Sequence, residues 1–186
     1  PATIERMAGH LQTLFTAITA NPEQSITRLP LLTEAERSKI LIEWNDTAHD
    51  YPADKCFHEL FEEQVERTPD NIAVVFEDER LTYRELNQRA NQLAHHLQTL
   101  GVGPEKFVGV CLERCADTLI SLLAIFKSGG VYIPLDPVLP STRLDFMIDN
   151  SEAVVVLTKS IYASKLPSPR SQIVPLDGDE QLIARQ

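Results

Sequence analysis

Apolar residues in the first third of the chain recur at intervals of three or four, which is the spacing of one face of an α-helix. This spacing predicts a helix over about residues 2–19, a second from residue 33 to about 44, and a third that begins near Phe57. An Asn-Pro and a Thr-Pro dipeptide end the first and third helices, because the residue before a proline disfavours the helical conformation. Residues 45–54 are polar and are interpreted as a connector.

Beyond residue 70 the pattern changes to short apolar stretches separated by helices. Continuous apolar runs predict strands at residues 72–76, 107–112, 131–135, 153–157 and 173–174. Helical spacing predicts helices at residues 82–100, 117–127 and 141–148. Strands without polar alternation that alternate with helices indicate an α/β fold, with a mainly parallel sheet flanked by helices. The change of pattern between residues 53 and 70 is the expected domain boundary, and residues 77–80 are expected to form a polar turn.

Local signals indicate where two of these helices start and where one ends. Thr33 with Glu36, and Thr82 with Glu85, have the capping-box spacing, in which the two side chains satisfy backbone N–H groups at a helix start. Gly101 stands where a helix-ending glycine is expected, since glycine readily adopts the left-handed conformation.

Composition excludes several classes of partner. The chain has 186 residues, 43% of them hydrophobic, which is enough for a packed core. Its formal net charge is -10 and its 17 basic residues are scattered, whereas nucleic acids and anionic membranes require clustered cations. The longest apolar run, residues 119–126, is too short to span a bilayer. We therefore expect neither a nucleic-acid partner nor a membrane.

Three cysteines, at positions 56, 111 and 115, form no disulfide framework, which favours a reducing compartment and a cytoplasmic protein. Cys111 and Cys115 are interpreted as packing residues, because neither a histidine nor a further cysteine stands near them to complete a metal site. The chain opens with Pro1, its first methionine is Met7, and no secretory signal is visible. We interpret this as a fragment of a longer protein.

The segment from Phe126 to Asp136 joins a helix directly to a strand. Gly129 or Gly130 is expected to take the positive φ that ends the helix, and a side chain there would hold the helix away from the strand. Pro134 marks the limit of the strand. Lys127, Tyr132 and Asp136 of this segment are interpreted as structural residues rather than ligand-binding ones.

Two other patterns fail as binding or catalytic sites. Gly101 and Gly103 resemble part of a dinucleotide loop, but that loop follows a strand and opens a helix, and here the glycines follow a helix. Asp145 and Asp149 are four residues apart, but they flank an apolar stretch and belong to the solvated face of a helix.

A succession of motifs in fixed order resembles the start of the amino-acid adenylation domains of nonribosomal peptide synthetases, within the AMP-dependent synthetase and ligase family. They are Leu-Thr-Tyr-Arg-Glu-Leu at 81–86, Gly-Val-Gly-Pro-Glu at 101–105, Val-Gly-Val-Cys-Leu-Glu-Arg at 108–114, Lys-Ser-Gly-Gly-Val-Tyr-Ile-Pro-Leu-Asp-Pro at 127–137, and Arg-Leu-Asp-Phe-Met-Ile-Asp at 143–149. Residues 29–36 and 44–47 are similar to the linker that joins a condensation domain to its adenylation domain.

The resemblance implies a division of the chain and a function for the parent protein. Residues 1–20 would be the last helix of a condensation domain, residues 21–54 the linker, and residues 55–186 the N-terminal part of the large subdomain of the adenylation domain. The parent enzyme would use ATP and Mg²⁺ to convert an amino acid to an aminoacyl adenylate. It would then load the acyl group on the phosphopantetheine thiol of a carrier domain.

The resemblance also implies what this chain lacks. The family's phosphate-binding loop, of the Thr-Ser-Gly-Thr-Thr-Gly type, would begin after Gln186, so we assign no catalytic, cofactor-binding or metal-binding residue here. His95 and His96 resemble the paired histidines of a condensation motif, but the required aspartate is replaced by Leu100, and they are interpreted as exposed helical residues. Two alternatives stay open, a non-catalytic docking module and a fragment of an acyl-CoA synthetase.

Overall fold

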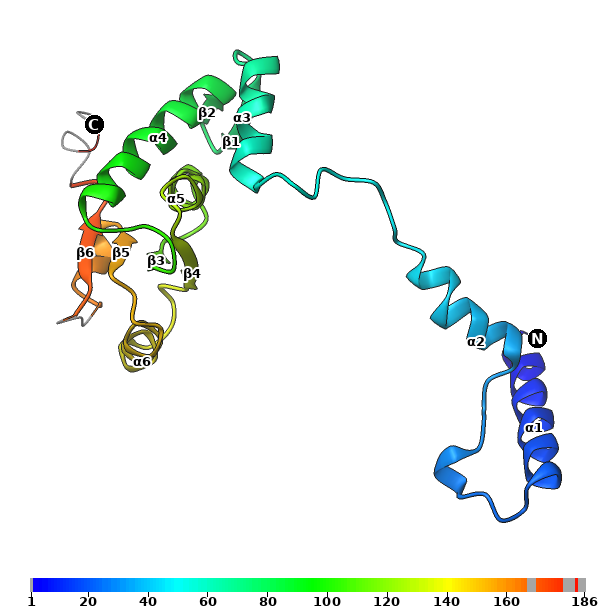
Figure 1. Cartoon of the computed structure of the whole chain (residues 1–186). Helices are drawn as coiled ribbons and strands as arrows, with labels where there is room; N and C mark the ends of the chain where they lie inside the picture. The colour runs from blue at the N-terminus through cyan, green and yellow to red at the C-terminus, as the bar shows by residue number, and fades with distance from the viewer. Residues whose placement is uncertain (1, 167–169, 179–182, 184–186) are drawn as a thin grey trace. The chain divides into compact units, whose positions relative to one another are not determined.

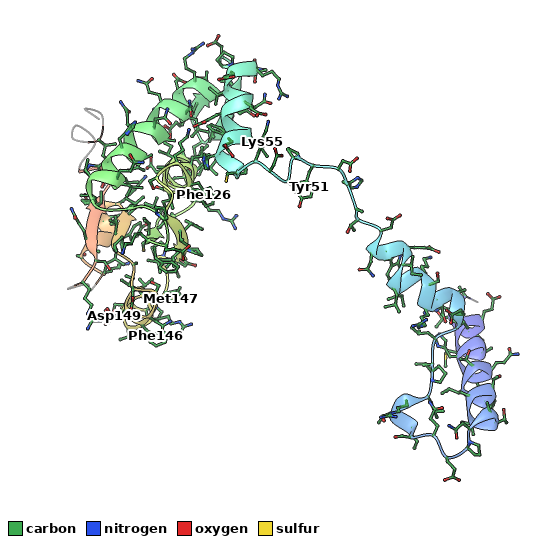
Figure 2. All side chains as sticks on the ribbon, in the orientation of Figure 1. Tyr51, Lys55, Phe126, Phe146, Met147 and Asp149 are labelled. Carbon is green, nitrogen blue, oxygen red and sulfur yellow. The ribbon has the colours of Figure 1, made fainter. Side chains whose placement is uncertain are left out.

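The computed structural model describes residues 2–166, 170–178 and 183 (Figure 1). The chain divides into two compact units, Pro1–Pro52 and Ala53–Gln186, each of which is described by itself. Residues 46–52 connect them without a helix or strand, and Tyr51 on this segment is exposed (Figure 2).

The first unit is helical and has no buried residue in its described part. It contains α1 (Ala2–Ala20), η1 (Ile26–Arg28), α2 (Glu34–Leu41) and η2 (Glu43–Asn45). The capping box at Thr33 and Glu36 is confirmed, with both reciprocal hydrogen bonds present. The second helix ends earlier than residue 44, because the Asn45 side chain donates to the carbonyl groups of Ile40 and Leu41 and so satisfies the helix end.

The second unit alternates helices and strands, as the sequence predicts. Its elements are α3 (Phe57–Arg67), β1 (Ile72–Phe76), β2 (Glu79–Thr82), α4 (Tyr83–Thr99), β3 (Phe107–Cys111), α5 (Ala116–Lys127), β4 (Val131–Leu135), α6 (Ser141–Ser151), β5 (Val155–Thr158), α7 (Ser160–Ala163) and β6 (Gln172–Pro175). The capping box at Thr82 and Glu85 and the left-handed Gly101, with φ of 84°, are both confirmed.

Within the described residues, the main sheet has the order β4-β3-β5-β6, and every pair in it is parallel. Each of the two edge strands, β4 and β6, carries a proline whose backbone nitrogen points away from the neighbouring strand. Val131 donates its N–H to the Lys106 carbonyl at 2.8 Å, so the alternation along β4 turns position 134 outward. Leu176 donates to Thr158 at 2.8 Å, which turns Pro175 outward in the same way. A missing N–H at these positions costs no hydrogen bond within the sheet.

The predicted polar turn at residues 77–80 is wrong in its second half, because Glu79 already belongs to strand β2. Phe76 pairs with Glu79, which leaves a two-residue loop whose first residue, Glu77, has a φ of 51°. The β2 strand escaped prediction because it is short and charged at its start. Its one deeply buried side chain, Leu81, is 3% exposed and packs in the core.

Two hydrophobic clusters cover the two faces of the sheet. Helices α4 and α5 pack on one face through residues such as Leu93 and Ile125, which share a cluster with Leu157 of β5. Helix α6 covers the other face through Leu144 and Ile148, and Figure 1 shows α5 and α6 on opposite sides of the strands. The α/β fold with a parallel sheet flanked by helices is confirmed.

Candidate functional site

The glycine pair between α5 and β4 has two separate tasks. Gly129 takes the left-handed conformation, with φ of 80°, that ends the helix. Gly130 allows close packing, because a Cβ atom on it would lie 2.8 Å from Val102 Cγ1 and 3.3 Å from Ile125 Cγ2. The sequence predicted both tasks and left open which glycine performs each.

The three residues singled out in this joint each have a partner within the chain. The Lys127 side chain is only 6% exposed and pairs with Glu62 of α3. Tyr132 packs against the cluster beneath α4 and α5. The Asp136 carboxylate accepts the N–H of Val138 at 2.9 Å, which closes the turn after β4. The geometry therefore supports a structural role for Lys127, Tyr132 and Asp136.

The carboxyl ends of the parallel strands form the edge of the sheet where α/β proteins usually bind ligands. The connection from β3 leads to β4 on one side, whereas β5 pairs on the other side of β3, so the strand order reverses between β3 and β5. Thr158 and Cys111 end these two strands, and the Thr158 hydroxyl donates to the Cys111 carbonyl at 2.9 Å. This edge is the candidate functional site.

Side chains beyond the strand ends are paired with one another across this edge. The Tyr162 hydroxyl donates to Glu113, which links α7 to the segment after β3. Lys159 Nζ lies 3.1 Å from the Asp117 carboxylate on the first turn of α5. Ser160 donates both its backbone N–H and its hydroxyl to Asp177, at 2.8 and 3.0 Å, and so joins the ends of β5 and β6.

The surroundings of Lys159, Tyr162 and Cys111 favour the charge state that each side chain ordinarily has near neutral pH. The hydrogen bond from Lys159 to Asp117 raises the pKa of the ammonium group, so Lys159 stays protonated. The hydrogen bond to Glu113 raises the pKa of the Tyr162 phenol. Burial, helped by the charge of Asp136, raises the pKa of the Cys111 thiol, which disfavours the nucleophilic thiolate. These three groups are thus poorly suited to act as bases or nucleophiles.

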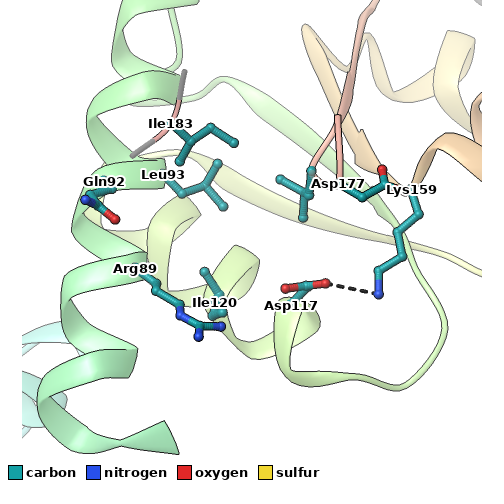
Figure 3. Close-up of a pocket in the computed structure, with 9 residues that line it drawn as sticks. Arg89, Gln92, Leu93, Asp117, Ile120, Lys159, Asp177 and Ile183 are labelled. Atoms are coloured by element: carbon teal, nitrogen blue, oxygen red, sulfur yellow. Dashed lines mark ion pairs between the residues drawn. The ribbon is translucent and has the colours of Figure 1, made fainter. Parts of the chain in front are cut away.

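A pocket of about 450 Å³ lies beside this edge, between α4, α5 and the segments that follow β5 and β6 (Figure 3). Its wall combines the Lys159–Asp117 ion pair with apolar side chains such as Leu93 and Ile120. Arg89, which also lines it, pairs with Glu79 at 2.9 Å. Its cationic side chains therefore already have carboxylate partners within the chain.

The structure corrects one residue of the histidine pair. His95 is exposed, but His96 is only 5% exposed, and its buried Nδ1 atom has no hydrogen-bond partner among the residues that the structure describes. The sequence missed this because His96 falls on the buried face of α4, next to Leu97. Gly101 and Gly103 lie between a helix and a strand, as interpreted from the sequence. On α6, Asp149 is exposed (Figure 2), whereas Asp145 is half-buried.

Metal sites and membrane spans are absent from the described ranges. Across residues 2–166, 170–178 and 183, His, Cys, Asp and Glu side chains form no group that could hold a metal ion. Cys56, Cys111 and Cys115 are free thiols. Within the same ranges, every helix is too short or too polar to cross a membrane.

The ion pair and the side-chain hydrogen bonds of the candidate site were not predicted from the sequence. Part of the signal was present, because Lys159 directly follows β5 and Glu113 stands two residues after the end of β3, and the carboxyl ends of adjacent parallel strands meet at one edge. The pair of Lys127 and Glu62 could not be predicted in this way, because 65 residues separate the two positions in the sequence. Neither residue interrupts the hydrophobic pattern of its own helix.

Comparison with known proteins gives the family. The sequence profile described as "AMP-binding enzyme" matches residues 61–184. The chain is 45% identical over 183 residues to a linear gramicidin synthase of Brevibacillus parabrevis, covering 98% of this chain and 4% of that protein. It is 42% identical over 175 residues to tyrocidine synthase 2 of the same organism, covering 94% of this chain and 5% of that protein. The chain thus spans a few per cent of the length of these relatives.

A solved structure shows the same fold with similar sequence. The AMPPNP-bound form of the nonribosomal peptide synthetase FmoA3 is 30% identical and superimposes with a TM-score of 0.71. The match covers 96% of this chain and 20% of that one, so it includes the helical first unit as well as the sheet.

Proposed function

The chain belongs to the AMP-binding enzyme family, and we propose that it forms the linker and the opening part of the adenylation domain of a nonribosomal peptide synthetase. One observation carries this proposal. The family profile begins at residue 61, but the similarity to the gramicidin synthase extends over 98% of the chain. The helical unit before the adenylation domain is therefore shared with peptide synthetases, which disfavours an acyl-CoA synthetase fragment.

In this proposal the parent enzyme activates an amino acid with ATP and Mg²⁺ and loads it on a carrier-domain phosphopantetheine thiol. This chain supplies scaffold and no catalytic, cofactor-binding or metal-binding residue. Support comes from the carboxyl edge of the sheet, where Lys159, Tyr162 and Asp177 are each held by a side chain or backbone group of the chain. It also comes from the sequence, which contains no Gly-, Ser- and Thr-rich loop of the kind that grips phosphate groups.

The proposed domains are residues 1–20 as the last helix of a condensation domain, 21–54 as the linker, and 55–186 as adenylation domain. Exposed apolar side chains on α1 support the first assignment, since Met7 is 63% exposed and Phe15 is 59% exposed. Such a face favours cover by an upstream domain. The remainder of the adenylation domain and a carrier domain are the proposed downstream partners, in a cytoplasmic enzyme.

The test is to express the reading frame extended through the next carrier domain and to measure amino-acid-dependent ATP–pyrophosphate exchange. We expect exchange with one or a few amino acids, followed by transfer of that amino acid to the carrier thiol. Formation of acyl-CoA from a fatty or aromatic acid, without amino-acid-dependent exchange, would instead identify an acyl-CoA synthetase.

A further inference from the structure

Helix α1 has two different faces. Ile4, Met7, Leu11, Phe15 and Ile18 follow each other at helical spacing and are between 41% and 72% exposed. Half a turn around the helix, a groove between α1 and the returning linker is lined, apart from Gln12, by small side chains and a glycine. They are Gly9, Thr13, Thr16, Ala17 and Ala20 of α1, with Pro30 and Thr33 of the linker among their partners. Different residues of α1 therefore form the exposed apolar face and the side that faces the linker.

Contact between α1 and the start of α2 is concentrated at two neighbouring residues. A Cβ atom on Gly9 would lie 3.4 Å from the Thr33 methyl group, so the linker passes close to the α1 backbone. Next to it, His10 Nε2 lies 3.0 and 2.9 Å from the two carboxylate oxygens of Glu36. Both side chains of this pair are about three-quarters buried, at 24% and 25% exposed.

Glu36 also belongs to the capping box of α2. Its carboxylate accepts the backbone N–H of Thr33 at 3.0 Å and the Thr33 hydroxyl at 2.9 Å, in addition to His10. One carboxylate thus fixes the start of α2 and reaches across to α1. Because the described part of the unit has no buried residue, few other contacts oppose the separation of the two helices.

We propose that His10 and Glu36 form a latch that holds α1 against the start of α2, so that the helix and the linker turn as one body. The role of the latch rests on the proposed function. A domain docked on the apolar face of α1 would keep a fixed orientation relative to the linker, because this pair joins α1 to the start of α2. Thr33 and the capping box make the connection stiff on the linker side, since they fix the first turn of α2.

The test uses the full chain and the nuclear Overhauser cross-peak between the Gly9 α-protons and the Thr33 methyl group. We expect the cross-peak in the native chain and its loss in both His10→Ala and Glu36→Gln. Glutamine still accepts the Thr33 N–H through its one oxygen, so Glu36→Gln keeps the capping box while it removes the charge and one of the two acceptor oxygens that face His10. The double variant should show no further change, because both substitutions remove the same contact.

Glu34→Gln is the matched control, since Glu34 lies in the same first turn and pairs with Arg37 at 3.5 Å on the exposed side of the helix. It should keep the cross-peak. Retention of the cross-peak in both single latch variants, or its equal loss in the control, would overturn the latch. Cα chemical shifts report whether α2 is still helical in each variant. If Glu36→Gln unfolds α2, the cross-peak in His10→Ala alone tests the latch. The readout needs no adenylation activity, so the latch and the proposed function can fail separately.

Discussion

Gly130 shows at the scale of one residue why the joint between α5 and β4 needs its sequence. Replacement by alanine would place a Cβ atom 2.8 Å from Val102 Cγ1, and Val102 is itself 5% exposed and packed in the core. We expect Gly130→Ala to lower the free energy of unfolding by about 1–3 kcal/mol, the usual cost of overpacking. Urea unfolding followed by far-UV circular dichroism measures this.

Gly103→Ala is the control for that experiment, because among the described residues no atom other than those of its chain neighbours lies within 4 Å of a Cβ atom placed there. Gly103→Ala should change the urea concentration at the midpoint of unfolding only slightly. Equal effects of the two substitutions would show that close packing at Gly130 is not the cause.

The lowered pKa of the Glu85 carboxyl makes the stability of the fold depend on pH. Its pKa is lowered, first by the hydrogen bond from the Thr82 backbone N–H and then by that from the Thr82 hydroxyl. A carboxyl whose pKa is lower in the folded state stabilises the fold above its ordinary pKa, and that stability is lost as pH falls through the folded value. Native protein should therefore lose more stability between about pH 5 and pH 3 than Glu85→Gln does. Parallel pH profiles of the unfolding midpoint would contradict this.

Residue-scale features were predictable where their cause is local. The capping boxes at Thr33 and Thr82 and the left-handed Gly101 depend on neighbours within a few positions, and all three were predicted. The burial of His96 and the partner of Lys127 depend on which helix packs alongside, and the sequence alone did not show it.

At the scale of elements, Lys127 ties the end of α5 to α3. Its side chain is 6% exposed, so removal of its partner leaves a largely buried ammonium group without a carboxylate. We expect Glu62→Gln to destabilise the chain by about 1–3 kcal/mol, less than a fully buried pair would cost, since Glu62 itself is 47% exposed.

Glu63→Gln, one position along the same helix, is the comparison. Glu63 pairs with Lys55, and both side chains are about two-fifths exposed, at 44% and 39%. That pair should be worth under about 1 kcal/mol. If the two variants unfold at the same urea concentration, the buried lysine does not need Glu62.

Elements with a strong apolar pattern were predicted almost to the residue. The strand at 107–112 is β3, Phe107–Cys111, and the predicted strand at 131–135 is β4, Val131–Leu135. Strand β2 and helix α7 were missed, because each has only four residues and takes its place from tertiary packing. The paired carboxyl edge of the sheet needs the strand order, which periodicity does not contain.

At the scale of the whole molecule, the two units should behave as separate bodies under protease. Residues 46–52 are exposed and form no helix or strand, so backbone groups there are accessible. We expect brief treatment with proteinase K to cut first between residues 46 and 52 and to leave the helices and strands of the second unit intact. First cleavage inside α4 or β3, seen by mass spectrometry, would show that the sheet unit is less stable than the linker.

We propose that this chain is scaffold for an adenylation reaction and that the nucleotide-binding groups belong to other parts of the parent protein. The most direct measurement is ATP–pyrophosphate exchange by the isolated chain, residues 1–186, with each of the twenty amino acids and Mg²⁺. We expect exchange no higher than in a reaction without protein. Amino-acid-dependent exchange by this chain alone would contradict it.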